Sequence, residues 1–139
     1  MPLAIGLYMR EPDFDIDGWC LEDGEARHRE TPATFWIPDF DRRDALQSGD
    51  LAKLVFRISV ENDEEPVAVE RMWVLVRGRL GHSYFGILDN DPHAIKENDE
   101  FCRGMELPFS ARHVIDIDPA DEATRAKAAE PPKRAWPRD

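Results

Sequence analysis

The N-terminal part of the sequence contains a pattern of aspartates that is similar to the start of a calcium-binding loop. Residues 13–18 read Asp-Phe-Asp-Ile-Asp-Gly, so carboxylates recur at every second position before a glycine. A calcium loop of this type also needs an acid at its twelfth position, where both oxygens bind the ion. That position is Gly24, and Glu25 follows one residue too late. We therefore expect no metal site here, and we interpret the segment as an acidic edge strand or loop with Phe14 and Ile16 facing inward.

Three further pairs of aspartates are separated by one residue. Residues two apart on a strand share one face, so each pair could bind a cation or hold a base. Their neighbours are instead typical of turns and helix caps, so we expect these side chains to shape the backbone. The pairs are Asp39 and Asp41, Asp89 and Asp91, and Asp116 and Asp118.

The histidines and cysteines lack the spacing of a metal site or of a catalytic pair. Zinc sites have short, regular His or Cys spacings, and none occurs here. Cys20 and Cys102 lie far apart in the chain, and we expect two buried thiols rather than a disulfide. Glycine-rich phosphate loops and the serine nucleophile motif are also missing from the sequence. We therefore predict that the protein is not an enzyme and has no catalytic residue, no metal and no cofactor.

The chain is strongly acidic. Its 139 residues include 29 Asp and Glu against 18 Lys and Arg, which gives a formal net charge of −11. This field would repel a polyanion such as DNA, so we expect no nucleic-acid partner. The same charge favours a cationic partner. With 42% hydrophobic and 34% charged residues, the composition is that of a soluble globular protein.

The first residues predict neither export nor membrane insertion. Residues 1–9 are apolar but have no basic start, and Arg10, Glu11 and Pro12 follow directly. A secretory signal needs a positively charged start and a small-residue cleavage site. No apolar run approaches the ~20 residues that span a bilayer. We expect a cytoplasmic protein with no membrane association.

The centre of the chain is rich in strands. Residues 51–60 alternate between apolar and polar positions, which is the period of a half-buried strand. A charged turn at residues 61–66 follows it. Residues 72–76 are apolar on both faces, so we place that strand, with Trp73, in the centre of the sheet. Short connections indicate antiparallel pairing between the expected strands, which are residues 51–60, 67–77, 82–88, 100–107 and 113–117.

Helices are expected only around this sheet. A single helical turn is expected within residues 39–47. Strong helix formers at 120–130 predict a C-terminal helix that Asp118 caps and that Pro131 ends.

These elements predict an α+β fold. We expect a strongly bent antiparallel sheet or a small open β-barrel of five to six strands, with one or two peripheral helices. Residues 1–118 are expected to form a single β-rich domain, and residues 119–139 a C-terminal helix and a mobile tail.

Spaced motifs over residues 32–117 relate the chain to a known group of domains. They are Pro32-x-Thr34-Phe35-x-Ile37-Pro38, Leu46-x-x-Gly49-Asp50-Leu51-x-Lys53-Leu54-x-Phe56, Glu70-Arg71-Met72-Trp73-Val74-x-Val76, Gly86-x-Leu88-x-Asn90-x-Pro92 and His113-Val114-Ile115-Asp116. With these motifs the chain resembles a group of small bacterial domains of unknown function, some relatives of which are predicted immunity proteins of polymorphic toxin systems. One departure is Asn98-Asp99, which stands where that group has a second Gly-Asp; Asn also tolerates the left-handed backbone of such a turn. The resemblance implies a compact β-rich fold and a protein-binding role, and it carries over no catalytic residue.

We expect the function to be binding. The resemblance and the negative charge favour a non-enzymatic acidic binding protein, and specifically an immunity-type inhibitor that covers a basic surface of a toxin. Acidic turns are expected to make the contact, since loops carry function more often than strands do. The expected partner-binding residues are Asp89, Asn90, Asp91, Glu97, Asp99 and Glu100.

Two other classes remain open. A small-molecule or peptide-binding regulatory module would use a groove near Trp36, Trp73 and Tyr84, since amphipathic aromatic residues mark many binding surfaces. A metal-dependent enzyme would need the aspartate pairs to bind a divalent cation. The sequence predicts no oligomeric state.

Overall fold

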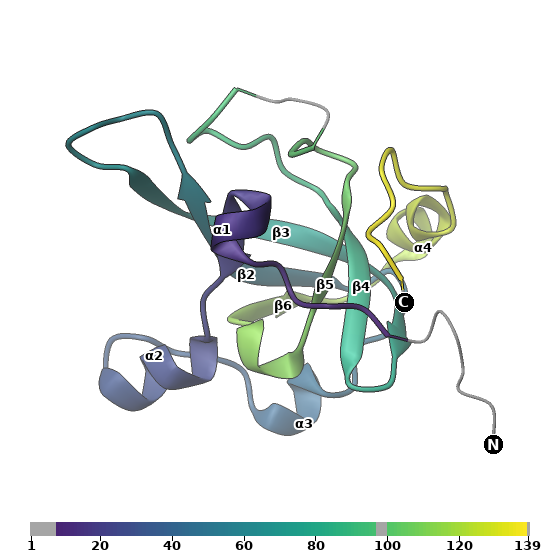
Figure 1. Ribbon diagram of the computed structural model, residues 1–139. Coiled ribbons are helices and arrows are strands. Elements are labelled where there is room, and N and C mark those ends of the chain that lie inside the picture. Colours follow the sequence, from purple (N-terminus) through teal and green to yellow (C-terminus); the bar gives the residue numbers. More distant parts are fainter. Residues whose placement is uncertain (1–7, 97–99, 139) are drawn as a thin grey trace, which may run out of the picture.

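A curled antiparallel sheet organises the molecule. The computed structural model describes residues 8–96 and 100–138. Within these residues, six strands form one sheet that curls into a half-barrel, and four short α-helices lie around it (Figure 1). The predicted α+β fold with a bent antiparallel sheet is confirmed. The elements are α1 (Phe14–Asp17), β1 (Trp19–Leu21), α2 (Gly24–Glu30), α3 (Phe40–Arg43), β2 (Leu51–Ser59), β3 (Val67–Leu80), β4 (Ser83–Leu88), β5 (Glu106–Phe109), the 3-10 turn η1 (Ala111–His113), β6 (Asp116–Asp118) and α4 (Glu122–Ala128).

The strands follow one another across the sheet in the order β1-β2-β3-β4-β5, and all pairs are antiparallel. β6 pairs with the first residues of β2, on the side that β1 also occupies. β3 is the longest strand, with 14 residues. Residues 67–75 of β3 pair with β2, and residues 74–80 pair with β4. Because these two stretches overlap only at residues 74–75, the β2–β3 hairpin extends beyond β4.

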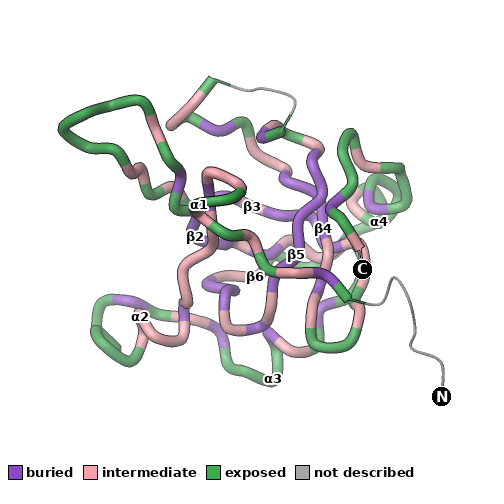
Figure 2. The backbone as a smooth tube through the Cα atoms, in the orientation of Figure 1, coloured by how far each residue is buried: buried purple, intermediate pink, exposed green. Residues whose placement is uncertain are grey.

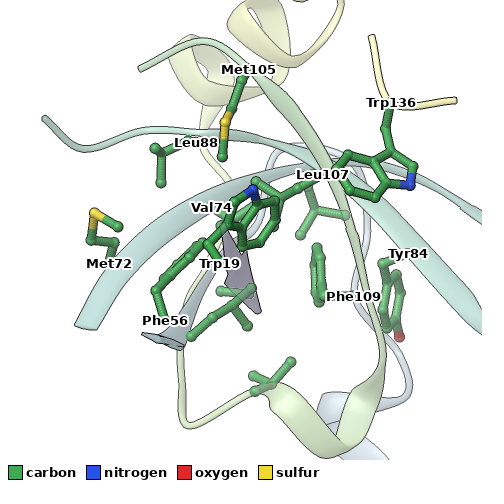
Figure 3. Packing of buried hydrophobic residues seen from close by; sticks show 14 of the residues in the cluster. Trp19, Phe56, Met72, Val74, Tyr84, Leu88, Met105, Leu107, Phe109 and Trp136 are labelled. Atoms are coloured by element: carbon green, nitrogen blue, oxygen red, sulfur yellow. The ribbon is translucent and has the colours of Figure 1, made fainter. Parts of the chain in front are cut away.

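The inner face of the curled sheet carries the hydrophobic core. Alternate residues of β2 point inward, and both Leu54 and Phe56 are completely buried, as the period-two pattern predicts. Aromatic rings from distant parts of the chain meet them there, as Figure 3 shows. The ring of Trp19 lies 5.7 Å from that of Phe56 and 5.8 Å from that of Trp136, measured between centroids. Burial of each large apolar side chain contributes roughly 1.5–3 kcal/mol.

The sheet bends where β3 meets β4. The register shifts between Val76 and Gly78, and bulges of this kind increase the local twist of a sheet. A Cβ atom at Gly78 would lie 2.6 Å from the ring of Phe85, and one at Gly86 would lie 2.5 Å from the carbonyl oxygen of Leu75. Glycine at these two positions therefore allows β3 and β4 to approach closely at the bend.

Two strands are shorter than the sequence predicts. The strand expected at residues 100–107 begins only at Glu106, because a turn precedes it in which Gly104 has a φ of 96°. The strand expected at residues 113–117 is reduced to Asp116–Asp118, because η1 occupies the residues before it.

The helices are short and lie on the outside of the sheet. The longest, α2 and α4, have seven residues each, and in the described ranges no helix is both long enough and apolar enough to cross a membrane. α4 packs on β3: Ala128 is buried, and its carbonyl oxygen accepts a hydrogen bond from Arg77 Nε. Elsewhere on the outer face, Phe35 packs against Val55.

The N-terminal region differs from the sequence prediction. Residues expected to form an acidic edge strand form α1, and Ile16, expected to face inward, is 73% exposed. Asp13 caps α1 by accepting hydrogen bonds from the backbone N–H groups of Asp15 and Ile16. Arg10 donates two hydrogen bonds of 2.8 Å to Asp17. The recurring aspartates therefore encode a helix cap and an ion pair.

The C-terminal segment, residues 131–138, lies against the core. From the sequence, this segment is expected to be part of a mobile tail. In the structure Trp136 is only 9% exposed, and its Nε1–H donates a hydrogen bond of 3.0 Å to the carbonyl oxygen of Arg10. Both ends of the described chain are thereby joined at one side of the half-barrel (Figure 1).

A buried carboxylate holds this segment in place. Glu106 accepts a hydrogen bond of 3.0 Å from the backbone N–H of Trp136 and forms ion pairs with Arg77 and Arg138. Burial opposes ionisation of Glu106, but the hydrogen bonds from Arg138 and from the Trp136 N–H outweigh it and hold the pKa of this carboxyl below its usual value. The carboxylate is therefore charged and paired on two sides near neutral pH.

Replacing Trp136 by alanine should lower the free energy of unfolding by about 3 kcal/mol, because the lost ring leaves a cavity beside Trp19. Urea denaturation followed by circular dichroism measures this loss. The matched control is W36A, since Trp36 is 64% exposed and its removal should cost less than about 1 kcal/mol. Equal losses in the two variants would contradict the observed packing of residues 131–138.

His113 is a buried histidine that caps a turn of the backbone. Its Nδ1 accepts a hydrogen bond of 2.9 Å from the N–H of Ser110. Burial, and then repulsion from Arg112, lowers the pKa of His113 from 6.5 to about 4. The imidazole is therefore neutral in the folded protein near pH 7.

The stability of the protein should fall as the pH drops from 7 to 5. His113 takes up a proton near pH 6.5 in the unfolded chain but only near pH 4 in the folded protein, so acid favours the unfolded state. The free energy of unfolding should decrease by about 2 kcal/mol over this range. The variant H113N keeps an acceptor close to the position of Nδ1 and does not titrate. An unchanged pH dependence in H113N, measured by urea denaturation at each pH, would assign the effect to other groups.

Candidate functional site

Three of the partner-binding residues predicted from the sequence lie together after β4. They are Asp89, Asn90 and Asp91. Lys127 Nζ donates a hydrogen bond of 2.6 Å to Asp89, and Arg103 lies 3.5 Å from Asp89 and 3.6 Å from Asp91. Two cations of the same chain therefore neutralise the two carboxylates at this corner. The negative charge expected here is largely compensated.

Asn90 has a structural contact. Its Oδ1 accepts a hydrogen bond of 2.5 Å from the backbone N–H of Trp73, while the N–H of Asp89 donates one of 3.0 Å to the carbonyl oxygen of Trp73. The Asn90 side chain thus takes the place of the backbone acceptor that a longer β4 would offer. It ends the pairing of β3 with β4.

The other three predicted residues are Glu97, Asp99 and Glu100. Glu97 and Asp99 are outside the described residues. Glu100 is exposed and lines a cavity of about 170 Å³ together with Arg10 and Trp136, whereas Asp89 lines a separate cavity beside α4. The structure therefore groups residues 89–91 and places Glu100 in different surroundings.

The three aromatic residues of the alternative hypothesis do not line one groove. Tyr84 is completely buried; its hydroxyl donates to the carbonyl oxygen of Arg43 at 3.0 Å and accepts from the N–H of Leu46 at 3.2 Å. Trp73 lies on the outer face of the sheet, where Lys53 Nζ is 5.3 Å from its ring centroid. Trp36 is 64% exposed and lies on the connection between α2 and α3. Tyr84 and Trp73 therefore belong to opposite faces of the sheet.

The strongest uncompensated charge lies on the turn between β2 and β3. Residues 61–65, which we call the acidic turn, are all exposed, as Figure 2 shows. Asn62 fixes their backbone, because its Oδ1 accepts hydrogen bonds from the N–H groups of Glu64 and Glu65 at 3.0 and 3.2 Å. No ion pair reaches the carboxylates of this turn from any described residue. They belong to Glu61, Asp63, Glu64 and Glu65.

A groove of about 640 Å³ lies beside the acidic turn. One wall comes from the end of β2 and the start of the turn, and the other comes from the loop after β4; both loops lie on the same side of the sheet in Figure 1. We call it the turn groove, and its lining residues are Ser59, Val60, Glu61, Asn62, Ala94, Ile95 and Lys96.

The second wall of the turn groove is anchored to β3. The carboxylate of Glu70 accepts hydrogen bonds from the backbone N–H groups of His93 and Ala94, at 2.7 and 3.2 Å. Val60, Ala94 and Ile95 also pack against the core cluster. The groove is therefore built on fixed elements at both sides. The sequence analysis identified the acidic turn only as a connection between strands; its signal is the run of four acids within five residues.

The structure offers little for metal or thiol chemistry in its described part. Nowhere among residues 8–96 and 100–138 do three or more His, Cys, Asp or Glu side chains come together in a way that could hold a metal ion. Burial raises the pKa of the Cys20 thiol, which makes it a poor nucleophile near neutral pH. Cys102 is also a free, half-buried thiol.

Comparison with known proteins adds no family. No family model, no curated protein and no solved structure matches this chain. The resemblance to immunity-related bacterial domains therefore stays a prediction from sequence motifs.

Removing the Asn90 side chain should destabilise the protein without altering its surface charge. N90A leaves the backbone N–H of Trp73 without its acceptor, which should lower the free energy of unfolding by about 1–2 kcal/mol. N90D keeps an acceptor oxygen and should retain most of the stability. The measurement is urea denaturation of all three proteins. If N90A matched the parent protein, the contact with Trp73 would carry no structural role.

Proposed function

We propose that the protein is a non-enzymatic binding protein that holds a cationic surface of a partner protein at the acidic turn. The observation that supports this is the accumulation of four exposed carboxylates within residues 61–65, none of which forms an ion pair with a described residue. The proposal keeps the acidic binding role expected from the sequence, but it moves the binding surface from the six residues expected within 89–100 to the acidic turn.

Several other carboxylates of the molecule, unlike those of the acidic turn, form ion pairs within the chain. Asp17, Asp89 and Glu106 each have an arginine or lysine of the same chain as a partner. Like charges on neighbouring residues repel each other, by about 1 kcal/mol for a pair 4 Å apart in water. A partner that brings cations to the acidic turn would relieve this repulsion. The acidic turn is therefore arranged to interact with something other than its own chain.

Two features favour association of this kind. The formal net charge of −11 attracts a basic protein over a distance and raises the rate of encounter. The hydrogen bonds to Asn62 hold the turn in one shape before binding, so less conformational freedom is lost when the partner docks.

The immunity-type role is the more specific form of this proposal. In that form the partner is a basic toxin, and the acidic turn covers part of the surface that the toxin needs for its activity. What supports it is the sequence resemblance together with the exposed, uncompensated charge of the turn.

Charge reversal on the acidic turn should weaken binding. A partner recovered by affinity capture from cells that express the chain should bind E64K/E65K at least about tenfold more weakly than the parent protein at low salt, and with a flatter salt dependence. Isothermal titration calorimetry measures both. In the immunity-type form, adding the parent protein in equimolar amount should also suppress the activity of that partner.

The matched control is D39K/D41K, which reverses two exposed acids at the start of α3 and changes the net charge by the same amount. It should bind nearly as well as the parent protein. Equal losses in the two variants would show that only net charge matters, and unchanged affinity in E64K/E65K would exclude the acidic turn.

A further inference from the structure

The turn groove identifies the kind of segment that the partner presents, and this inference rests on the proposed function. We propose that the groove binds a short segment in which a large aliphatic or aromatic side chain directly adjoins two or more Lys or Arg residues. The apolar side chain enters the groove, and the cations lie over the acidic turn.

Three of the seven residues that line the groove are apolar, and we call these three its floor. Val60, Ala94 and Ile95 are each partly buried and pack against the core cluster. The backbone at Ala94 is further held by Glu70. A partly exposed apolar surface on a rigid support favours an apolar occupant, because burial of such surface drives association.

The size of the groove agrees with such an occupant. Its volume of about 640 Å³ falls within the range of roughly 300–1,000 Å³ that is usual for ligand pockets. It is large enough for one or two bulky side chains of a docked peptide. It is partly open to solvent, so a segment of a larger protein can enter it from outside.

The charges at the two walls are opposite. Glu61 lines the wall that leads into the acidic turn, and Lys96 lines the other wall. Lys96 repels a cation on its side, so the basic residues of the occupant are restricted to the side of the acidic turn. The groove therefore favours an occupant whose basic residues all lie on one side of its apolar side chain. A uniformly basic segment does not meet this requirement.

The aromatic residues on the outer face of the sheet are less suited to docking. Arg27 and Arg71 lie 4.7 and 5.3 Å from the ring centroid of Phe35, and Lys53 lies 5.3 Å from that of Trp73. Cations of the same chain thus already cover these rings.

Three peptides of equal length test the inference by nuclear magnetic resonance titration of the ¹⁵N-labelled protein. They are acetyl-Lys-Lys-Lys-Leu-Phe-amide, acetyl-Lys-Lys-Lys-Gly-Ser-amide and acetyl-Glu-Glu-Glu-Leu-Phe-amide. The first should bind about tenfold more tightly than the second, because only it buries apolar side chains. The amides of Val60, Ala94 and Ile95 should shift with the first peptide, and those of residues 61–65 with both lysine peptides. The third peptide should bind weakest.

Two variants test the groove itself. A94W fills the groove, and I95S removes apolar floor without filling it; each should reduce the affinity for the first peptide to that for the second. The matched control is A33W, which places the same ring at an exposed position between α2 and α3 and should leave both affinities unchanged. I95S keeps the test decisive if A94W disturbs the fold.

The outcomes separate the two proposals. Equal binding of the two lysine peptides, with shifts confined to the acidic turn, would overturn the groove inference and leave the proposed function intact. Absence of binding by either lysine peptide would overturn the proposed function and this inference with it. If the glutamate peptide bound as tightly as the first, the groove would select apolar groups without regard to charge, and the inference would also fall.

Discussion

The staggered pairing of β3 is the constraint on which the architecture depends. This strand has 14 residues, of which residues 67–75 face β2 and residues 74–80 face β4. Each neighbouring strand pairs with only one half of β3, so the sheet cannot be a flat rectangle. The bulge between Val76 and Gly78 turns the second half over the core. The first half carries the acidic turn outward, where no described residue forms an ion pair with its carboxylates.

Charge is distributed unevenly as a result. Where strands and helices meet, carboxylates find arginine or lysine partners, as Glu106 does with Arg77 and Arg138. At the projecting hairpin no such partner lies nearby within the described residues, and the carboxylates remain together. For recognition, the position of the carboxylates that have no ion-pair partner therefore matters more than the net charge of −11. Residues 89–91 also carry two acids within three residues, but they lie next to Lys127 and Arg103.

Local sequence patterns predict much of the sheet, but they do not predict the candidate site at the acidic turn and the turn groove. Period-two alternation predicts β2 almost to the residue, and apolar residues on both faces place Trp73 on a central strand. The pattern fails at Asp13 and Asp17, because hydrogen bonds to α1 and to Arg10 outweigh the alternation of Phe14 and Ile16. It also misses the contact of Trp136 with the core, since that contact depends on residues far away in the chain. Tyr84 and Trp73 could be separated only once the register showed that they face opposite sides of the sheet.

The C-terminal segment has a consequence for the free side of β5. The N–H of Glu106 points away from β4 and donates to the carbonyl oxygen of Arg134 at 2.8 Å, and Pro108, two residues on, has no N–H to donate. The outermost strand of the sheet thus presents little to which another polypeptide could add by backbone hydrogen bonding. This edge of the sheet therefore resists fibril-like stacking.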